Sequence, residues 1–418
     1  MTFPAKLPNL LKRFGTSQKG NVAIMFALSA VPMFLAAGAC IDYARYSASV
    51  TKLQSALDSA ALSGAAARDL PDAKRIALAT ATFKENLRSG DLSNATSDFK
   101  VKNGTVVASA QLALDTTFMK VGGIDVMQLS AATEIAIPED KNAEIALVLD
   151  YSGSMEDSIA GGVKYVAMKN AAKKLIEDLQ VANPSKVKFA LVPFSHHVYV
   201  TLPKPFVLGQ TGSGNWTGCT QDRPYPANIT DDTPTANDAT KWGQANAPEH
   251  AGWGCSGYVS HNLKVAPLTN DFNGLKNQLD AMTPYAWTHI ALGVEFGFHV
   301  LSDDTPFTTG VSYTDKKTEK IMIVLTDGEQ TEPAFGPGVR NASQGESNLE
   351  ELCKNAKVKG ITMMTVAYDL NDSSTRARLR NCSTDPAKHF FTASDTAAVA
   401  SAFDNIKNVI TAQVFISK

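Results

Sequence analysis

The sequence predicts an α/β fold: a doubly wound, mostly parallel sheet with a long irregular insertion, preceded by a transmembrane helix and a small α+β module. Three observations support this prediction. Residues 22–41 form an uncharged apolar run. After residue 140, strands that are apolar throughout alternate with helical segments, as in parallel sheets covered on both faces. Residues 201–268 contain 7 Pro and 8 Gly, a density that interrupts regular structure.

Length, charge and residue content exclude several classes of protein. A length of 418 residues suggests two or three domains. With 39 Lys and Arg against 41 Asp and Glu, the net charge of −2 excludes a dominant basic surface, so no nucleic-acid partner is expected. A hydrophobic content of 44% argues against disorder, and five cysteines are too few for a small disulfide scaffold.

The N-terminal segment predicts a single membrane crossing. Residues 1–21 form a basic head without acidic residues, which the positive-inside rule keeps in the cytoplasm. Residues 22–41 are long enough to span about 30 Å of hydrocarbon, and membrane helices tolerate a proline such as Pro32. The rest of the chain would then be translocated.

A cleaved signal peptide and a lipoprotein anchor are two other interpretations of this segment. A signal peptide cleaved near Ala37 to Ala39 would leave no anchor, but the apolar run exceeds the usual signal core of about 7–15 residues. A lipoprotein linked through Cys40 is disfavoured because Ala37 is a poor residue three positions before such a cysteine. We therefore expect a retained anchor.

Residues 42–138 predict a long helix followed by a small α+β module. Small and apolar residues from Leu53 to Ala61 recur at helical spacing, and we expect this face to pack on the module. The Asn103-Gly104 pair between alternating runs predicts a hairpin. The expected elements are a helix at 72–87 and strands at 98–102, 105–114 and 128–137.

Residues 140–418 predict the doubly wound domain, in which 201–268 is the insertion. The strands are expected at 145–149, 187–193, 320–326 and 361–367. The helices are expected at 163–180, 289–301, 347–358 and 396–411.

Four cysteines follow the apolar run, and four allow three pairings. Their distribution favours a bridge between Cys219 and Cys255 inside the insertion and another between Cys353 and Cys382 across the last βα unit. Four buried free thiols are the alternative. An oxidising compartment outside the cytoplasm favours the bridges.

Acidic and hydroxyl residues gather at strand ends. The strand ending at Leu149 runs into Asp150, Ser152 and Ser154, and the strand at 321–326 runs into Asp327. Thr288 stands just before a predicted helix. Open α/β sheets place their ligands at the carboxyl ends of their strands, so we expect these five side chains to converge.

Two carboxylates and three hydroxyls form a hard-oxygen set suited to a divalent cation. We expect Mg²⁺, with Mn²⁺ and Ca²⁺ as alternatives. Two carboxylates only neutralise the ion, so an open coordination position would attract an acidic side chain of a partner protein. Glu329 and Asp369 also lie at strand ends, either as a rim of this site or as solvated loop acids.

The sequence gives little support to an enzyme. Ser152 and Ser154 have no histidine beside them in the chain, and His289 is more typical of a residue at a helix start. His196 and His197 are adjacent at a strand end, where we expect them to point to opposite faces and not to share a metal. We expect neither catalysis nor a small-molecule substrate.

Three segments carry a resemblance to a known domain. IALVLDYSGSM at 145–155, WTHIALG at 287–293 and IMIVLTDGE at 321–329 resemble the von Willebrand factor A domain and its metal-ion-dependent adhesion site. The resemblance covers residues 140–418, and all five motif positions are present. It implies a domain that binds a divalent cation and, through it, an acidic residue of a partner.

The N-terminal segment carries a second resemblance. Residues 20–67, from GNVAIMF to SGAAA, resemble TadE/TadG-like pilus-assembly proteins, as do Cys353 and Cys382 in their contexts. This implies a role in Flp pilus assembly or tight adherence, with other pilus-assembly or envelope components as partners. It also implies a bacterial inner-membrane protein, its bulk periplasmic or reaching the cell surface.

One position departs from that pattern. Met25 stands where pilins of this system carry Glu, five residues after a cleavage-site glycine, which argues against processing and for the retained anchor. A structural envelope scaffold, whose domain packs against partners without a metal, remains the alternative function.

Overall fold

The computed structural model describes residues 21–67, 70–88, 90–138, 141–182, 184–245, 255–338 and 340–414. Residues 1–20 of the basic head thus lie outside the described residues. The chain forms two compact units, Met1–Glu139 and Asp140–Lys418.

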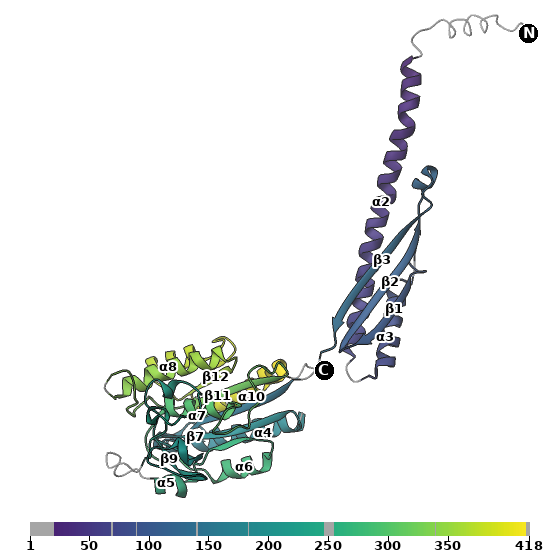
Figure 1. Ribbon diagram of the computed structural model, residues 1–418. Coiled ribbons are helices and arrows are strands. Elements are labelled where there is room, and N and C mark those ends of the chain that lie inside the picture. The colour runs from purple at the N-terminus through teal and green to yellow at the C-terminus, as the bar shows by residue number, and fades with distance from the viewer. Residues whose placement is uncertain are drawn as a thin grey trace, which may run out of the picture. The chain divides into compact units, whose positions relative to one another are not determined.

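The first unit is built on one long helix. Helix α2 spans Asn21–Ala66, 46 residues, and includes Pro32. In the part of the chain that the structure describes, it is the one helix long and apolar enough to cross a membrane. Its apolar half lies along the purple end of the ribbon in Figure 1 and leaves side chains such as Phe26 and Phe34 more than 70% exposed.

The second half of α2 packs on a small module. Helix α3 (Asp72–Asn86) and an antiparallel sheet in the order β1-β2-β3 form this module. Its strands are β1 (Thr96–Lys102), β2 (Thr105–Asp115) and β3 (Val126–Ala136), with the short helix η2 (Met119–Gly122) between β2 and β3. Leu53, Leu57 and Ala61 are fully buried in its core, which confirms the expected packing face.

A six-stranded sheet forms the centre of the second unit. The strand order is β10-β7-β4-β11-β12-β13, and every neighbouring pair is parallel except β10 with β7. The strands are β4 (Asn142–Asp150), β7 (Val187–Phe194), β10 (Ala266–Thr269), β11 (Thr318–Thr326), β12 (Thr362–Tyr368) and β13 (Phe390–Ala393). The predicted doubly wound sheet is therefore present.

Helices cover both faces of this sheet. Alternate residues of β4 enter opposite cores, because side chains along a strand point to alternate faces: Ile145 and Leu147 enter one and Ala146 and Val148 the other. The first core includes α4 (Lys164–Ala182), α6 (Phe272–Ala281) and α10 (Thr396–Val414); the second includes α7 (Ile290–Leu301) and α8 (Ala342–Val358). Helix α9 (Ser373–Cys382) contacts β12 and α8.

The insertion is more regular than its composition suggested. It opens with an antiparallel hairpin, β8 (Val198–Pro203) with β9 (Asn215–Thr220), and includes α5 (Cys255–Ser260) and three short 3-10 helices. Strand β10 begins at Ala266, inside the expected range 201–268, and is an edge strand of the main sheet. The short helices are η4 (Lys204–Phe206), η5 (Ala227–Ile229) and η6 (Asp238–Thr240).

Both favoured disulfides are present. Cys219 bonds Cys255 and so ties β9 to α5 within the insertion. Cys353 bonds Cys382 and joins α8 to α9.

A buried ion pair attaches the insertion to α7. Arg223 donates from Nε to Glu295 Oε1 at 2.7 Å, and Trp242 donates from Nε1 to the same oxygen at 3.0 Å. The Arg223 guanidinium also lies over the Trp242 ring, 4.7 Å from its centroid. All three side chains are at most 1% exposed, so this contact replaces water on both sides of the interface.

We expect Arg223→Met to lower the free energy of unfolding of the second unit by about 3–5 kcal/mol, because it leaves the Glu295 carboxylate buried without its countercharge. Urea unfolding followed by tryptophan fluorescence measures this, since all four tryptophans lie between residues 216 and 287. Arg378→Met is the control: Arg378 pairs with Glu346 at 3.0 Å in a more exposed setting and should change little. A loss below about 1 kcal/mol for Arg223→Met would contradict the expectation.

Candidate metal centre

Two neighbouring parallel strands bring the two predicted carboxylates to one edge of the sheet. Leu149 of β4 pairs in register with Leu325 of β11, so Asp150 ends one strand beside Thr326 on the other. Thr326 donates from Oγ1 to Asp150 Oδ2 at 2.6 Å, and Asp327 follows directly. The register of β4 with β11 therefore determines the spacing of the two acids.

The loop after β4 links Asp150 to Asp327 through hydroxyl groups. The amide of Ser152 donates to Asp150 Oδ1 at 2.8 Å, which turns the chain back over that carboxylate. The hydroxyl oxygens of Ser152 and Ser154 lie 3.1 Å apart, and Ser154 donates to Asp327 Oδ1 at 2.7 Å. A chain of hydrogen bonds, which begins at the Ser152 amide and continues through two hydroxyl groups, thus joins the two strand ends.

Thr288 reaches the same place from the loop before α7. A Cβ built on Gly328 would lie 3.6 Å from Thr288 Oγ1 and 3.8 Å from Ser154 Oγ, so both hydroxyls face this glycine. The amide of Thr288 donates to Thr331 Oγ1 at 3.0 Å, and its carbonyl accepts from the amide of Thr331 at the same distance. The structure therefore brings all five predicted side chains together.

Burial disfavours the ionised form of both carboxylates. Asp150 is fully buried and Asp327 is 7% exposed. Loss of water, and after it the nearby charge of Asp327, raise the pKa of Asp150 above its ordinary range. Burial likewise raises the pKa of Asp327, against the opposing hydrogen bonds from Ser154 and Lys164. Both raised pKa values indicate that the groups around the two carboxylates do not fully stabilise their negative charge.

The donor set fits a small divalent cation. The described residues contain no group of three or more His, Cys, Asp and Glu that could hold a metal, so any ion here must also use hydroxyl oxygens. Two carboxylates with hydroxyls from Ser152, Ser154 and Thr288 are the oxygen donors that Mg²⁺ accepts. Ser154 is exposed, so one side of the set is open to solvent.

Family models match both ends of the chain. The model for Flp pilus-assembly TadE/G-like proteins matches residues 20–67. The model for the von Willebrand factor type A domain matches residues 144–205 and 270–405, leaving the insertion between them unmatched. The chain joins a TadE/G-like segment to a von Willebrand factor type A domain. None of the curated proteins compared matches it.

Solved structures with a similar fold include several pilus proteins. The von Willebrand factor domain of Mfa5, a type V pili tip protein of Porphyromonas gingivalis, is 14% identical, covers 67% of this chain and 99% of its own, and gives a TM-score of 0.42. The pilus adhesin SpaC of Lactobacillus rhamnosus GG is 16% identical, with coverage of 77% and 34% and a TM-score of 0.39. The PilB minor pilin of Streptococcus sanguinis is 12% identical, with coverage of 78% and 79% and a TM-score of 0.39. The domain assignment rests on the family models, since these TM-scores are below 0.5.

Lys164 is the site residue that sequence reasoning missed. It is the first residue of α4, and its Nζ lies 3.0 Å from Asp327 Oδ2 and 3.1 Å from Asp369 Oδ2. Its side chain is 7% exposed. Asp369, named from the sequence as a rim residue, thus reaches the site through Lys164, whereas Glu329 is exposed to solvent. The Gly161-Gly162 pair just before Lys164 predicts a turn, and this turn was the sequence feature that could have indicated a position for Lys164 near the site.

Three histidines lie close to the start of α7. Contrary to the expected opposite orientation, the rings of His196 and His197 touch, with centroids 4.0 Å apart. His196 Nδ1 lies 2.9 Å from Glu332 Oε1. His289 is buried, and its amide donates to Ser195 O at 2.8 Å, as suits a residue at the start of α7.

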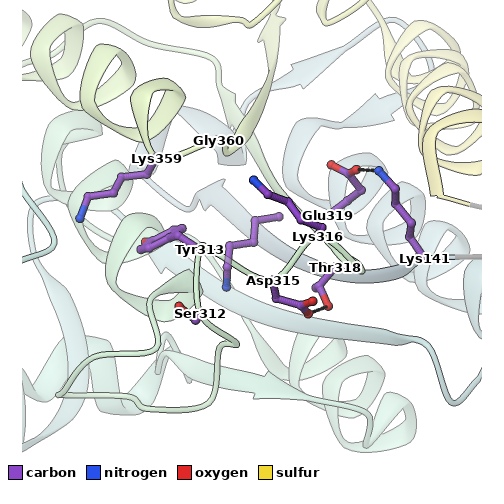
Figure 2. Close-up of a pocket in the computed structure, with 10 residues that line it drawn as sticks. Lys141, Ser312, Tyr313, Asp315, Lys316, Thr318, Glu319, Lys359 and Gly360 are labelled. Atoms are coloured by element: carbon purple, nitrogen blue, oxygen red, sulfur yellow. Dashed lines mark hydrogen bonds and ion pairs between the residues drawn. The ribbon is translucent and has the colours of Figure 1, made fainter.

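A separate cavity of about 200 Å³ opens at the opposite, amino-terminal edge of the sheet. Figure 2 shows Lys359 and Lys316 near Tyr313, and Lys141 beside Glu319. Lys141 pairs with Glu319, Lys320 with Glu144, and Lys359 with Asp231, so these cations are neutralised by acids of the same domain. This cavity is therefore distinct from the candidate metal centre.

We expect Asp150→Asn to raise the melting temperature of the domain in EDTA by about 2–4 °C, because it removes one of two buried charges that repel each other. Differential scanning calorimetry measures this shift. Asp280→Asn, at a half-exposed carboxylate paired with Lys173, is the matched control and should give no rise. A lower melting temperature for Asp150→Asn would show that the hydrogen bonds of this carboxylate outweigh its repulsion from Asp327.

Proposed function

We propose that the chain is a membrane-anchored envelope protein of Flp pilus assembly or adherence. Its von Willebrand factor domain binds a divalent cation and, through it, an acidic side chain of a protein partner. Mg²⁺ is the expected cation. Asp150, Ser152, Ser154 and Thr288 hold it directly or through water, and Asp327 completes the set. The observation that supports this most is the convergence of all five side chains on one open edge of the sheet.

The cation would supply an electrophilic centre, and the chain determines how strong it is. With all three acids ionised, Asp150, Asp327 and Asp369 carry three negative charges and Lys164 one positive charge, so the cluster has a net charge of −2. One divalent cation neutralises this charge and keeps its attraction for a further anionic ligand. The fourth nearby acid, Asp157, is 3.9 Å from Lys164 and 70% exposed, so water screens it.

An exposed aromatic ring beside the site supports a protein partner. Trp287 immediately precedes Thr288 and is 54% exposed. Its ring lies against His196 with centroids 5.9 Å apart, which limits its freedom. Tryptophan is among the residues that contribute most to the affinity of protein interfaces. A partner carboxylate at the cation would place its neighbouring residues over this ring.

The TadE/G-like match supports the location and the partners. That family acts in Flp pilus assembly by its name, and α2 provides one apolar helix fit for a single-pass anchor. Lys6, Lys12, Arg13 and Lys19 before the apolar run would keep the N-terminus in the cytoplasm. The domain would then face the periplasm or reach the cell surface, among other pilus or envelope components.

A structural scaffold that uses no metal is the second candidate. The bridge from Lys164 to Asp327 and Asp369 favours it, because an ammonium already compensates part of the buried charge. No reaction is proposed for either candidate.

The full-length chain in detergent tests the proposal by isothermal titration with MgCl₂, followed by capture of envelope proteins with Mg²⁺ or with EDTA. We expect Mg²⁺ binding that Asp150→Ala abolishes, and a partner that is retained only by the wild-type chain with Mg²⁺. Asp280→Ala is the control for the loss of a carboxylate remote from the site. A partner retained equally in EDTA and by Asp150→Ala would support the scaffold instead.

We expect substitutions of the two residues of the Lys164 bridge to shift Mg²⁺ affinity in opposite directions. Lys164→Met removes a positive charge beside the cation and should lower the Mg²⁺ dissociation constant about tenfold. Asp369→Asn removes a negative charge and should raise it about threefold. Lys173→Met, which removes another paired lysine of α4, should leave it unchanged. Weaker binding in both site variants would show that the bridge acts only by holding the loops in place.

A further inference from the structure

Beyond the apolar half of α2, four of the exposed apolar side chains of the first unit lie in one loop. This loop, residues 117–126, joins β2 to β3 and includes η2. Phe118 is 43%, Val121 78%, Ile124 47% and Val126 39% exposed. Four large apolar side chains within nine residues form a patch of the kind that marks a contact with a protein or a membrane.

The loop lies beside the end of the apolar run. A Cβ built on Gly38 would lie 2.5 Å from Phe118 Cβ, so backbone and ring are in direct contact there. Figure 1 shows η2 next to α2, at the far end of the β2-β3 hairpin. Gly38 precedes Asp42, the first charged residue after the run, by about 6 Å along the helix. Phe118 therefore contacts α2 on the N-terminal side of Asp42, among the apolar residues of the helix.

Hydrogen bonds hold the loop at this level. The carboxylate of Asp42 accepts from the amides of Phe118 and Met119, both at 2.7 Å, and from the amide of Thr117 at 3.1 Å. Asp42 is 3% exposed. Arg45, one turn further along α2, donates to Thr117 Oγ1 at 2.7 Å. The exposure of the apolar side chains is thus imposed by bonds to the helix.

The loop is also closed on itself. The amide of Ile124 donates to Met119 O at 3.1 Å, and that of Gly123 donates to Lys120 O at 3.0 Å. Gly123 has φ of 85°, a backbone conformation that glycine adopts without strain. A preformed apolar tip enters a membrane interface without the entropy loss of ordering a flexible segment.

We propose that loop 117–126 is a second membrane contact, whose apolar side chains enter the interface of the bilayer that residues 22–41 span. The inference rests on the single-pass anchor of the proposed function and is independent of the metal site. Lipid is the occupant because the patch is continuous, through Phe118 and Gly38, with the surface that faces lipid. Interfacial segments bury their apolar side chains about 5–10 Å deep, which matches the level of Phe118 relative to Asp42.

The contact also explains the surroundings of Asp42. A carboxylate at the end of a membrane span loses much of its water and needs hydrogen-bond donors in exchange. The loop supplies three amides and places its apolar residues toward the bilayer. Lys120, exposed in the same loop, can extend its ammonium to the headgroups while its methylene groups stay among apolar atoms. Two contacts, helix and loop, then fix the tilt of the first unit on the membrane.

Fluorescence of the full-length chain in vesicles of phosphatidylethanolamine and phosphatidylglycerol tests the proposal. The environment-sensitive label NBD is attached to Val121→Cys in a Cys40→Ser background, with both disulfides intact. Asn103→Cys is the matched control: it lies in the turn at the other end of β2, about 33 Å away along the strand. Quenching by doxyl-labelled lipid and by aqueous iodide is compared for the two positions.

We expect the label at 121 to emit at shorter wavelength, to be quenched by doxyl lipid and to be protected from iodide at least about threefold relative to the label at 103. Equal iodide quenching at both positions, without quenching by lipid, would overturn the membrane contact and leave the patch to a protein partner. Failure of the chain to bind Mg²⁺ would not affect this result. Lipid quenching at both positions would also overturn it, because the loop would then not be distinguished from the rest of the module.

Discussion

The candidate metal centre depends on one constraint, the in-register parallel pairing of β4 with β11. That pairing ends both strands at the same level and places the carboxylates of Asp150 and Asp327 in one buried volume. Two such charges repel, and loss of water raises the free energy of each. The groups around them are donors: Thr326 and the Ser152 amide to Asp150, and Ser154 and Lys164 to Asp327. The proposed cation at this edge would add the positive charge that these donors do not supply.

The same constraint links the site to the insertion. Thr288 is one of the two residues that directly precede α7, and every residue of α7 is buried. Glu295, two turns along this helix, receives both Arg223 and Trp242 of the insertion. A helix enclosed on all sides cannot shift without repacking both layers. Packing of the insertion against α7 therefore limits movement of Thr288. Trp242 shows that at least one tryptophan of the insertion is a core residue.

Local patterns in the sequence predict most of the fold and identify the five oxygen donors. Apolar strands and the residues after them identify a sheet edge, because the edge is set by strand direction alone. Lys164 was missed since a lysine at a helix start is ordinarily a solvated residue, and only the β5-β6 turn (Ser158–Ile159 with Gly162–Val163) folds it over Asp327. The hairpin of the insertion was missed because proline and glycine hid its alternation, and the apolar loop next to Gly38 depends on a contact between residues 80 positions apart.

Comparison of two buried acids shows why we propose one as a metal ligand and the other as structural. Asp42 stands alone, and three backbone amides satisfy its oxygens, so no cation is needed. Asp150 faces a second carboxylate, and the hydroxyl groups around the pair are donors that can turn their lone pairs toward a metal. Amides are fixed donors and would repel a cation, whereas serine and threonine hydroxyls accept as well as donate. The chemistry of the neighbours, rather than burial of the acid itself, decides which carboxylate is available to an ion.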